Sequence, residues 1–452
     1  MLAWFAVLVG CSADKKSFER PANAEEELLV ELAQLIDPNT SGLEEFFDQI
    51  GEQDVDGAKQ TLLNYFREKE IPSWALPDPL PIEQQTLING LAAWRGNFSF
   101  QGVEGKALLE DGTIDWESRG PRNDPEWTWF LHRHFFLREM MVLYQAQGHH
   151  EFVAQVNNYL LDWFWRFPPP ESQSFSASWR ALEAARRYVD SWLPVYAELR
   201  GHPAFSEEAE LAVIVGAARH AQYLRNFHHF GGNHLVTEMM SLAAIAAVWP
   251  EFSDSKEWMG YAVDRALEEL ERQVYPDGAH KELANHYQWI AGSSFQRLYR
   301  ILVGSGANDS LDQMKPRMEK LWDYYARVTR PDGTGPLNND SDLEPNASQL
   351  LSLAEFYGRT LFIPGHLGLA EGGVEFDTQD PRAQHALETF AGSVPGISPV
   401  AFDLQGYANN RVMFNALISR LNEAIVGELT LDQAYERMVD DVAKQIAEQE
   451  RQ

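Results

Sequence analysis

The sequence predicts an all-α protein whose consecutive helices form an α/α barrel or solenoid. Apolar residues recur every three or four positions over most of the chain, which is the spacing of amphipathic helices. Between residues 126 and 330 no segment shows the alternation of apolar and polar residues that indicates a strand. The predicted helices follow one another with short connections, which favours a repetitive helical architecture over a small bundle.

The composition indicates a globular protein with ample material for a core. Of the 452 residues, 44% are hydrophobic and 12% are aromatic. The formal net charge is −30, which argues against nucleic-acid binding through a global positive field. An anionic ligand would therefore need a local cluster of Arg, Lys and His side chains.

The first residues resemble a bacterial lipoprotein signal. Residues 1–10 are apolar and end at Cys11, the only cysteine, as in a lipobox. This run is too short to span a bilayer, and it lacks the Lys or Arg that normally precedes such a signal. We expect residues 1–23 to be a signal and tether, with a membrane contact only through a lipid at Cys11 and a periplasmic or cell-surface location. The alternative is a chance apolar N-terminus with a buried free thiol.

Residues 24–110 are predicted to form a helical region followed by a connector. Apolar residues at helical spacing define amphipathic faces between residues 28 and 66. Prolines between residues 72 and 81 then break the chain into an extended connector. Residues 97–105 are predicted as a loop or a short strand.

From residue 125 the chain is a succession of long, aromatic-rich helices. Pro168 and the two prolines after it are expected to stop the second of them, and another begins near Ser178. Apart from the helix near Ser178, helices are predicted over residues 126–147, 151–167, 206–227, within the stretch 231–248, and over 255–274, 284–303 and 312–329.

The glycine pair Gly231–Gly232 precedes one of these helices. Glycine lets the backbone bend and lets a ligand come close. Asn233 is a good N-cap residue, and the free N–H groups of a helix start bind anions. The helix start is thus predicted to face a cleft. The alternative is that Asn233 only caps the helix and His234 is a partly buried core residue.

No metal or cofactor site is predicted. His280 and His286 are six residues apart, which is not a compact helical spacing for metal ligands, and no cysteine assists them. The chain also lacks a phosphate-cradling glycine motif and a serine nucleophile elbow.

Four blocks of sequence resemble the N-terminal α/α-toroid domain of the heparinase II/III-like polysaccharide lyases, a group that includes alginate lyases. They are EWTWFLHRH at 126–134 with SWR at 178–180, GNHL at 232–235 with WPEF at 249–252, QVYPDGAHKEL at 273–283 with NHY at 285–287, and PDGT at 331–334 with NDSD at 339–342. The resemblance implies an incomplete α/α barrel over residues 111–360, with extra N- and C-terminal helices.

In that family a β-sandwich follows the toroid, and this sequence departs there. Residues 361–452 lack the alternating strands that a sandwich requires, so we expect a linker and a helical tail, with the sandwich missing. Two helices are predicted between residues 409 and 446, with Thr430 as the N-cap of the second. This tail resembles the end of an ABC-importer sugar-binding protein. The alternative is a helical cap.

The resemblance implies β-elimination on a uronate-containing polysaccharide. Such a site must neutralise the uronate carboxylate, remove the adjacent C–H proton and protonate the leaving oxygen. By correspondence with the family, Asn233 would hold the carboxylate and His234 would carry a proton or share the charge. Tyr287 would donate a proton to the leaving oxygen and perform the abstraction as well. Taken without the family, Tyr287 is an ordinary buried aromatic.

Substrate binding is assigned to arginines and to neighbouring polar or aromatic residues. Arginine suits bidentate binding of carboxylate or sulfate, and a tryptophan can stack on a sugar ring. Trp129 is expected in the core, whereas for Trp127 core and stacking roles both stay open. Glu282 either orients a catalytic side chain or lies on the surface. The substrate-binding residues expected are Arg133, Arg180, Arg186, Trp127, His286 and Glu282.

The predicted function is therefore a polysaccharide lyase acting on an acidic polysaccharide such as alginate or a glycosaminoglycan. The alternative is a non-catalytic glycan-binding or scaffold protein with a truncated lyase toroid, because the expected absence of the sandwich leaves the site incomplete.

Overall fold

The fold is described from a computed structural model, over residues 20–307, 310–330, 332–357, 420 and 429–449. The chain forms two compact units, residues 1–329 with 335–362 and residues 330–334 with 363–452. In the described part of the chain, no helix combines the length and the apolar character needed to cross a membrane. Cys11 and the first predicted tail helix lie outside the described residues.

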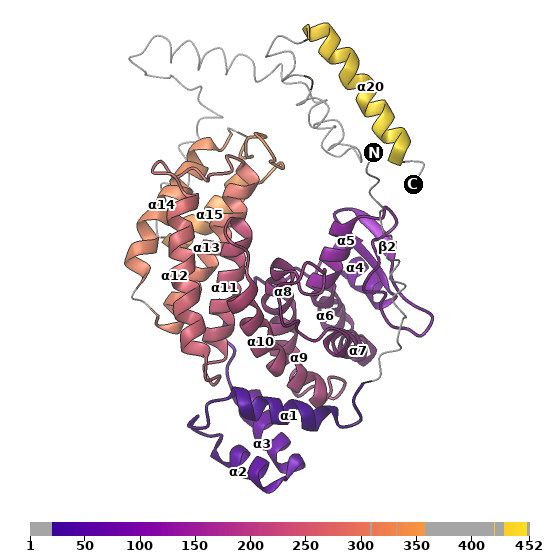
Figure 1. The fold of residues 1–452 in the computed structure, drawn as a ribbon, viewed down its shortest axis with the longest axis vertical. Helices are drawn as coiled ribbons and strands as arrows, with labels where there is room; N and C mark the ends of the chain where they lie inside the picture. Colours follow the sequence, from indigo (N-terminus) through magenta and orange to yellow (C-terminus); the bar gives the residue numbers. More distant parts are fainter. Residues whose placement is uncertain (1–19, 308–309, 331, 358–419, 421–428, 450–452) are drawn as a thin grey trace, which may run out of the picture. The chain divides into compact units, whose positions relative to one another are not determined.

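The first unit consists almost entirely of helices, as predicted. In the main series of helices each one packs on the next member of the series or on the next but one: α11 contacts α10, α12 and α13, and α13 contacts α14 (Figure 1). The helices of this series are α6 (Phe135–Gln147), α7 (His150–Arg166), α10 (Glu207–Phe227), α11 (Asn233–Val248), α12 (Ser255–Gln273), α13 (Asn285–Ser305), α14 (Leu311–Val328) and α15 (Asn346–Tyr357).

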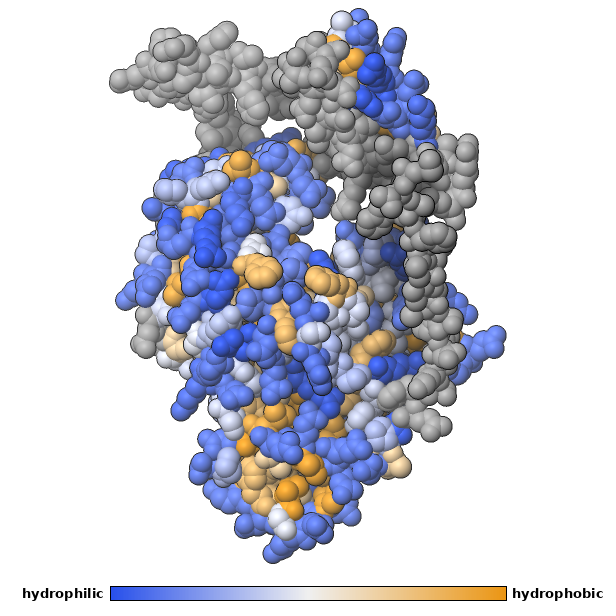
Figure 2. Space-filling view, in the orientation of Figure 1, coloured by the Kyte–Doolittle hydropathy of each residue, from blue (hydrophilic) through white to orange (hydrophobic). Residues whose placement is uncertain are grey.

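The described chain begins with three helices: α1 (Ala24–Leu35), α2 (Glu44–Glu52) and α3 (Val55–Glu68). Helix α1 packs on α3 and α10, and α2 packs on α3. Ion pairs between Glu31 and Arg219 (2.6 Å) and between Lys69 and Glu251 (2.6 Å) join this segment to α10 and to the α11–α12 corner. Figure 2 shows hydrophobic residues gathered over α1–α3 on a face that is otherwise largely hydrophilic. The division at residue 110 stays a prediction.

A connector and a hairpin link these helices to the series. The prolines of the connector flank a short 3₁₀ turn, η1 (Ser73–Ala75), and α4 (Gln84–Trp94) follows and packs on α6. Strands β1 (Asn97–Phe100) and β2 (Val103–Lys106) pair antiparallel, with Asn97 opposite Lys106, and form the one sheet within the described residues. The short strand predicted here is thus confirmed.

The helix predicted over 126–147 is two helices. Helix α5 (Pro125–Arg133) ends at His134, whose φ of +60° breaks the helix before α6 begins. His134 is fully buried, and its Nδ1 accepts a hydrogen bond from Trp192 Nε1 at 2.9 Å. A left-handed residue other than glycine is uncommon, and here a tryptophan partner and close packing hold it.

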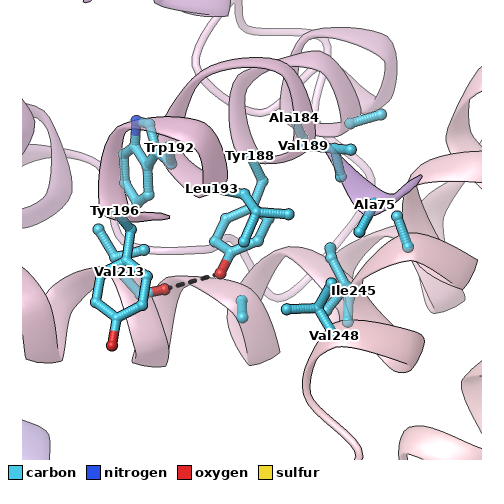
Figure 3. Packing of buried hydrophobic residues seen from close by; sticks show 14 of the residues in the cluster. Ala75, Ala184, Tyr188, Val189, Trp192, Leu193, Tyr196, Val213, Ile245 and Val248 are labelled. Carbon is cyan, nitrogen blue, oxygen red and sulfur yellow. Dashed lines mark hydrogen bonds between the residues drawn. The ribbon is translucent and has the colours of Figure 1, made fainter. Parts of the chain in front are cut away.

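The helix expected from Ser178 also differs from the prediction. Helix α8 (Ala181–Arg187) runs into a π-helical turn, η2 (Tyr188–Trp192), and continues as α9 (Leu193–Leu199). Tyr188 and Trp192 lie in the core, and Tyr188 Oη donates to the Val213 carbonyl of α10 at 3.2 Å (Figure 3). Such turns insert one extra residue into a helix and often occur at functional sites. The turn therefore changes which side chains face inward after Arg187.

In the second unit the described helix is α20 (Leu431–Gln449). Its start carries a capping box: Gln433 N donates to Thr430 Oγ1 at 3.2 Å, and Thr430 N donates to Gln433 Oε1 at 3.0 Å. The prediction that Thr430 caps this helix is confirmed.

Candidate active site

The glycine pair Gly231–Gly232 forms the turn that immediately precedes α11. Gly232 has φ +89°, a conformation that favours glycine, and it is the N-cap of the helix. Asn233 is therefore the first helical residue, and the prediction that it caps the helix is wrong. Its side chain is 9% exposed, and its amide makes no hydrogen bond to any other residue of the described chain. A buried, uncommitted amide at a helix start is suited to bind an anionic group.

A chain of hydrogen bonds connects this turn to the start of α13. Gly232 N donates to Glu269 Oε2 (3.2 Å), and Gln273 Nε2 donates to the same oxygen (2.7 Å). His280 Nε2 donates to Gln273 Oε1 (2.9 Å), and His280 N donates to a side chain of α13. The first turns of α11 and α13 thus lie at the same end of the helical array, beside the end of α12. His280 serves this framework, and burial lowers its pKa to about 4.

The first group of polar residues at this end is named the α11 cluster. Its members come from α5, α8, α11 and the segment before α11: Arg133, Arg180, Glu183, His229, Asn233, His234 and Glu238. His229 Nδ1 donates to Glu238 Oε1 at 2.5 Å, and His229 N donates to Glu238 Oε2 at 2.8 Å. The ring centroids of His229 and His234 are 4.9 Å apart.

The two histidines of the α11 cluster differ in protonation. The hydrogen bond to Glu238 raises the pKa of His229, so His229 carries positive charge further into the neutral range than an ordinary histidine. Burial, with the positive charges of His229 and Arg180 nearby, lowers the pKa of His234 to about 4. At neutral pH His234 is therefore a neutral imidazole, and it lies beside an imidazole whose protonated form Glu238 favours.

Two arginines in the cluster share one buried carboxylate. Glu183 is fully buried and accepts from Arg133 Nη2 at 2.9 Å and from Arg180 Nη1 at 2.7 and 2.9 Å. Each guanidinium also lies over an aromatic ring, Arg180 over Trp129 at 4.2 Å and Arg133 over Phe130 at 4.3 Å. The two guanidinium groups balance the two carboxylates of the cluster, so protonation of His229 makes the local charge positive in a strongly acidic protein.

The second group, named the α13 cluster, consists of Glu282, His286, Tyr287, Asp340 and Glu344. Tyr287 Oη donates to Asp340 Oδ2 at 3.2 Å, and His286 Nδ1 donates to Glu344 Oε1 at 2.6 Å. The bond to Glu344 raises the pKa of His286, and burial raises the pKa of the Glu282 carboxyl.

The loop at residues 338–342 is fixed against the start of α13. Ser341 Oγ accepts from Asn285 N at 2.7 Å, and the amides of Asn285 and Asn346 exchange hydrogen bonds of 3.0 and 3.1 Å. Asn339 Nδ2 donates to the Leu283 carbonyl at 2.7 Å. The sequence blocks around residues 285 and 340 therefore form one local structure.

The predicted site residues thus fall into separate places. Asn233, His234, Arg133 and Arg180 lie in the α11 cluster, whereas Tyr287, His286 and Glu282 lie in the α13 cluster at the same end of the array. Arg186 belongs to neither cluster: its Nη1 donates to Asp190 at 2.8 Å in a cavity described below.

The stacking role assigned to Trp127 is wrong. Its side chain is 3% exposed, its Nε1 donates to the Val103 carbonyl at 3.2 Å, and Gly105 and Gly120 leave room for its ring. Trp129, expected in the core, is half-buried beneath Arg180. No group of three or more His, Cys, Asp or Glu residues with metal-site geometry occurs among the described residues.

Three residues of the α11 cluster had no role predicted from the sequence. Glu183 lies three residues after Arg180 and three before Arg186, a spacing that predicts ion pairs on one helix. His229 and Glu238 lie on either side of the glycine turn, so no helical spacing in the sequence predicts their ion pair.

The protonation of His229 can be tested by replacing Glu238 with glutamine. The substitution keeps the shape but removes the charge, so the pKa of His229 should fall towards the ordinary value, about 6.5. A group with a raised pKa stabilises the fold below its unfolded pKa, and this contribution is lost as pH rises through the folded pKa. Glu238→Gln should remove that part of the pH dependence of stability.

The measurement is a titration of histidine ring protons by NMR. His286, which pairs with Glu344 in the other cluster, serves as the control and should keep its raised pKa. An unchanged titration of His229 in the Glu238→Gln variant would show that Glu238 does not set its charge.

Comparison with known proteins identifies relatives of the first unit. Residues 32–360 match the family described as Heparinase II/III N-terminus. The heparin-sulfate lyase of Bacteroides stercoris is 27% identical over 349 residues, covering 72% of this chain and 52% of that protein. The heparin-sulfate lyase of Pedobacter heparinus is 27% identical over 314 residues, covering 67% of this chain and 47% of that protein.

Two solved structures share the fold. A crystal structure of heparinase III superposes with a TM-score of 0.64 at 20% identity, over 73% of this chain and 53% of that one. The heparan sulfate lyase of Pedobacter heparinus gives 0.59 at 23% identity, over 77% and 56%. The predicted incomplete α/α toroid is confirmed by this similarity. The chain spans about half the length of the curated relatives it matches.

Proposed function

Since the chain belongs to the heparinase II/III N-terminus family, we propose that it contributes the toroid half of a glycosaminoglycan lyase, one that cleaves a heparan-type chain by β-elimination. The observation that carries the proposal is the side-chain amide of Asn233, which is buried at the start of α11 and makes no hydrogen bond within the described chain. It lies beside a neutral His234 and near His229, whose protonated form Glu238 stabilises. A uronate carboxylate seated there meets donors and positive charge on one side.

In this proposal the α11 cluster stabilises the negative charge that develops during the reaction. Removing the proton next to a uronate carboxylate develops enolate charge on the carboxylate oxygens. The Asn233 amide and the free N–H groups of the first turn of α11 would donate to those oxygens. Arg180 and the protonated form of His229 add positive charge, and Glu183 and Glu238 hold these two groups in place. Fixed donors of this kind need no reorganisation when the charge develops.

The chemistry asked of the α13 cluster is proton transfer. Tyr287 is half-buried at the start of α13, and its hydroxyl is oriented by Asp340. We assign both proton transfers to Tyr287: its hydroxyl proton goes to the leaving glycosidic oxygen, and its phenolate oxygen takes up the C–H proton, so the tyrosine ends protonated as it began. With a pKa of about 4, His234 is too weak a base for the abstraction, so we assign it a hydrogen-bonding role towards the carboxylate.

The proposal is tested by following the ultraviolet absorbance of unsaturated uronates on heparan sulfate, heparin, chondroitin and alginate. We expect turnover on the heparan-type chains. Tyr287→Phe removes only the hydroxyl, so turnover should fall by about 100-fold or more, the usual contribution of a positioned acid or base. Tyr299→Phe, a change to another half-buried tyrosine further along α13, is the matched control.

Two outcomes would contradict the proposal. Full turnover in Tyr287→Phe would remove Tyr287 from the reaction. Binding of the polysaccharides without release of unsaturated product by the 452-residue chain would favour a glycan-binding protein.

The remaining expectations are proposals of the same kind. We propose that Cys11 is lipidated and that the protein is periplasmic or on the cell surface. Either location would give it access to extracellular polysaccharides. Mass spectrometry of the N-terminal peptide from membranes tests this, since an unmodified Cys11 in a processed or intact N-terminus contradicts it.

A further inference from the structure

A cavity of about 570 Å³ lies among α6, α8, α13 and the 73–80 connector. Four arginines line it: Arg138, Arg186, Arg297 and Arg300. Such a concentration of positive side chains is unusual in a chain with a net charge of −30. None of the lining residues belongs to the α11 or the α13 cluster. The cavity adjoins α11 deeper in the array, where Ser294 Oγ, which lines it, lies 3.0 Å from Thr237 Oγ1.

The π-helical turn η2 provides the carboxylate that orders two of these arginines. Asp190, in the middle of the turn, is 4% exposed and accepts from Arg186 and from Arg297. Its neighbours Tyr188 and Trp192 face the core, as Figure 3 shows. The extra residue of the turn thus allows one short segment to serve the core and the cavity together.

Four arginines and three carboxylates, those of Asp78, Glu139 and Asp190, line the cavity. Asp190 is shared by two guanidinium groups, and Arg138 donates to the Asp78 backbone carbonyl at 2.5 Å. Glu139 accepts from Asn89 at 2.8 Å, and burial raises the pKa of its carboxyl, which lessens its negative charge. Basic side chains therefore outnumber acidic ones in the lining by one.

Arg297 also carries a donor that the fold leaves unused. Its Nε is buried and makes no hydrogen bond to any part of the described chain. Unsatisfied buried donors are rare because each one costs free energy, and they often mark a place where a ligand supplies the acceptor. Trp74 and Trp289 line the same cavity and offer aromatic surface beside the charges.

We propose that this arginine cavity is a second anion-binding site, which takes a sulfate or carboxylate group carried on a saccharide unit. Guanidinium groups bind such oxyanions through paired hydrogen bonds, and tryptophan rings pack on sugar faces. The volume suits one saccharide unit, since small-molecule sites commonly enclose about 300–1,000 Å³. The saccharide part rests on the proposed function, whereas the anion part does not.

The test is calorimetric titration of the full chain with a sulfated heparan disaccharide, its unsulfated counterpart and inorganic sulfate. Arg180→Gln serves as the background, so that binding at the α11 cluster is weakened. We expect the sulfated disaccharide to bind, inorganic sulfate to compete with it, and the unsulfated counterpart to bind about 10-fold more weakly. Adding Arg297→Gln should weaken the sulfated disaccharide by about 10-fold or more.

Two further variants serve as an independent test of the cavity and as a negative control. Arg138→Gln removes a cavity arginine that donates to a backbone carbonyl, so it tests the site without touching the Asp190 pairs. Arg225→Gln removes an arginine on α10 that pairs with exposed Glu257, and it should leave binding unchanged. Circular dichroism melts establish that each variant is folded.

Binding of the sulfated disaccharide that is unaffected by both Arg297→Gln and Arg138→Gln would overturn the proposal. So would a loss of sulfate binding in these variants without any loss of disaccharide binding, because the saccharide would then be bound elsewhere. Arginine-dependent disaccharide binding by a chain with no lyase turnover would refute the proposed function and support this site.

Discussion

Replacing Glu183 with glutamine should destabilise the first unit by about 3 kcal/mol, the lower end of the range for breaking a buried ion pair. Glu183 is fully buried and is the carboxylate that both Arg133 and Arg180 contact. Its loss would leave two guanidinium groups, 14% and 17% exposed, without their counter-ion. Glutamine fills the same volume, so the loss reports charge rather than packing.

The measurement is urea unfolding followed by tryptophan fluorescence. Glu257→Gln is the matched control, because Glu257 pairs with Arg225 in water and its side chain is 52% exposed. Exposed pairs contribute about 0–1 kcal/mol, so the control should change little. Removing Arg180 as well should recover part of the stability lost in Glu183→Gln, since one uncompensated charge disappears with it. Equal stability of Glu183→Gln and wild type would show that water, not Glu183, compensates the arginines.

The fold was largely predictable because most helices carry one clear apolar face. The bounds predicted for α7, α10 and α12 agree with the structure to within one residue at either end. The break at His134 was not predictable, since a left-handed residue other than glycine leaves no compositional signal. The π-helical turn at Tyr188–Trp192 was missed for a related reason: one inserted residue shifts the apolar face without disrupting its spacing.

From the sequence, site residues could be grouped only where they lie together at the start of a single helix. Asn233 and His234 stand beside a glycine pair, which marks a bend in any helical protein. Trp127 is buried and Trp129 is only half-buried because of contacts with residues distant in the sequence. Gly105 and Gly120 leave room for the ring of Trp127, and the guanidinium of Arg180 lies over the ring of Trp129. Local spacing holds no information about such partners. The Tyr287–Asp340 contact likewise joins segments far apart in the sequence.

Replacing Asn233 with aspartate should abolish turnover on heparan-type chains while leaving the fold intact. Aspartate is nearly isosteric with asparagine, and a negative charge in the first turn of a helix is favourable. Arg180 and the protonated form of His229, whose charges act on the adjacent His234, would stabilise the new carboxylate, so urea unfolding should show no loss of stability. The same carboxylate would occupy the position proposed for the substrate carboxylate and repel it.

The size of the decrease in turnover distinguishes repulsion of the substrate carboxylate from the simple loss of the Asn233 hydrogen bond. Asn233→Ala removes one donor, for which a decrease of about 100- to 1,000-fold in kcat is usual, whereas Asn233→Asp adds repulsion and should lower turnover further. The new charge should also raise the pKa of His229 above its wild-type value in the NMR titration, because a nearby negative charge favours the imidazolium. If Asn233→Asp turns over substrate as fast as Asn233→Ala, the amide does not face the substrate carboxylate. The anion-binding role of α11 would then have to rest on the arginines alone.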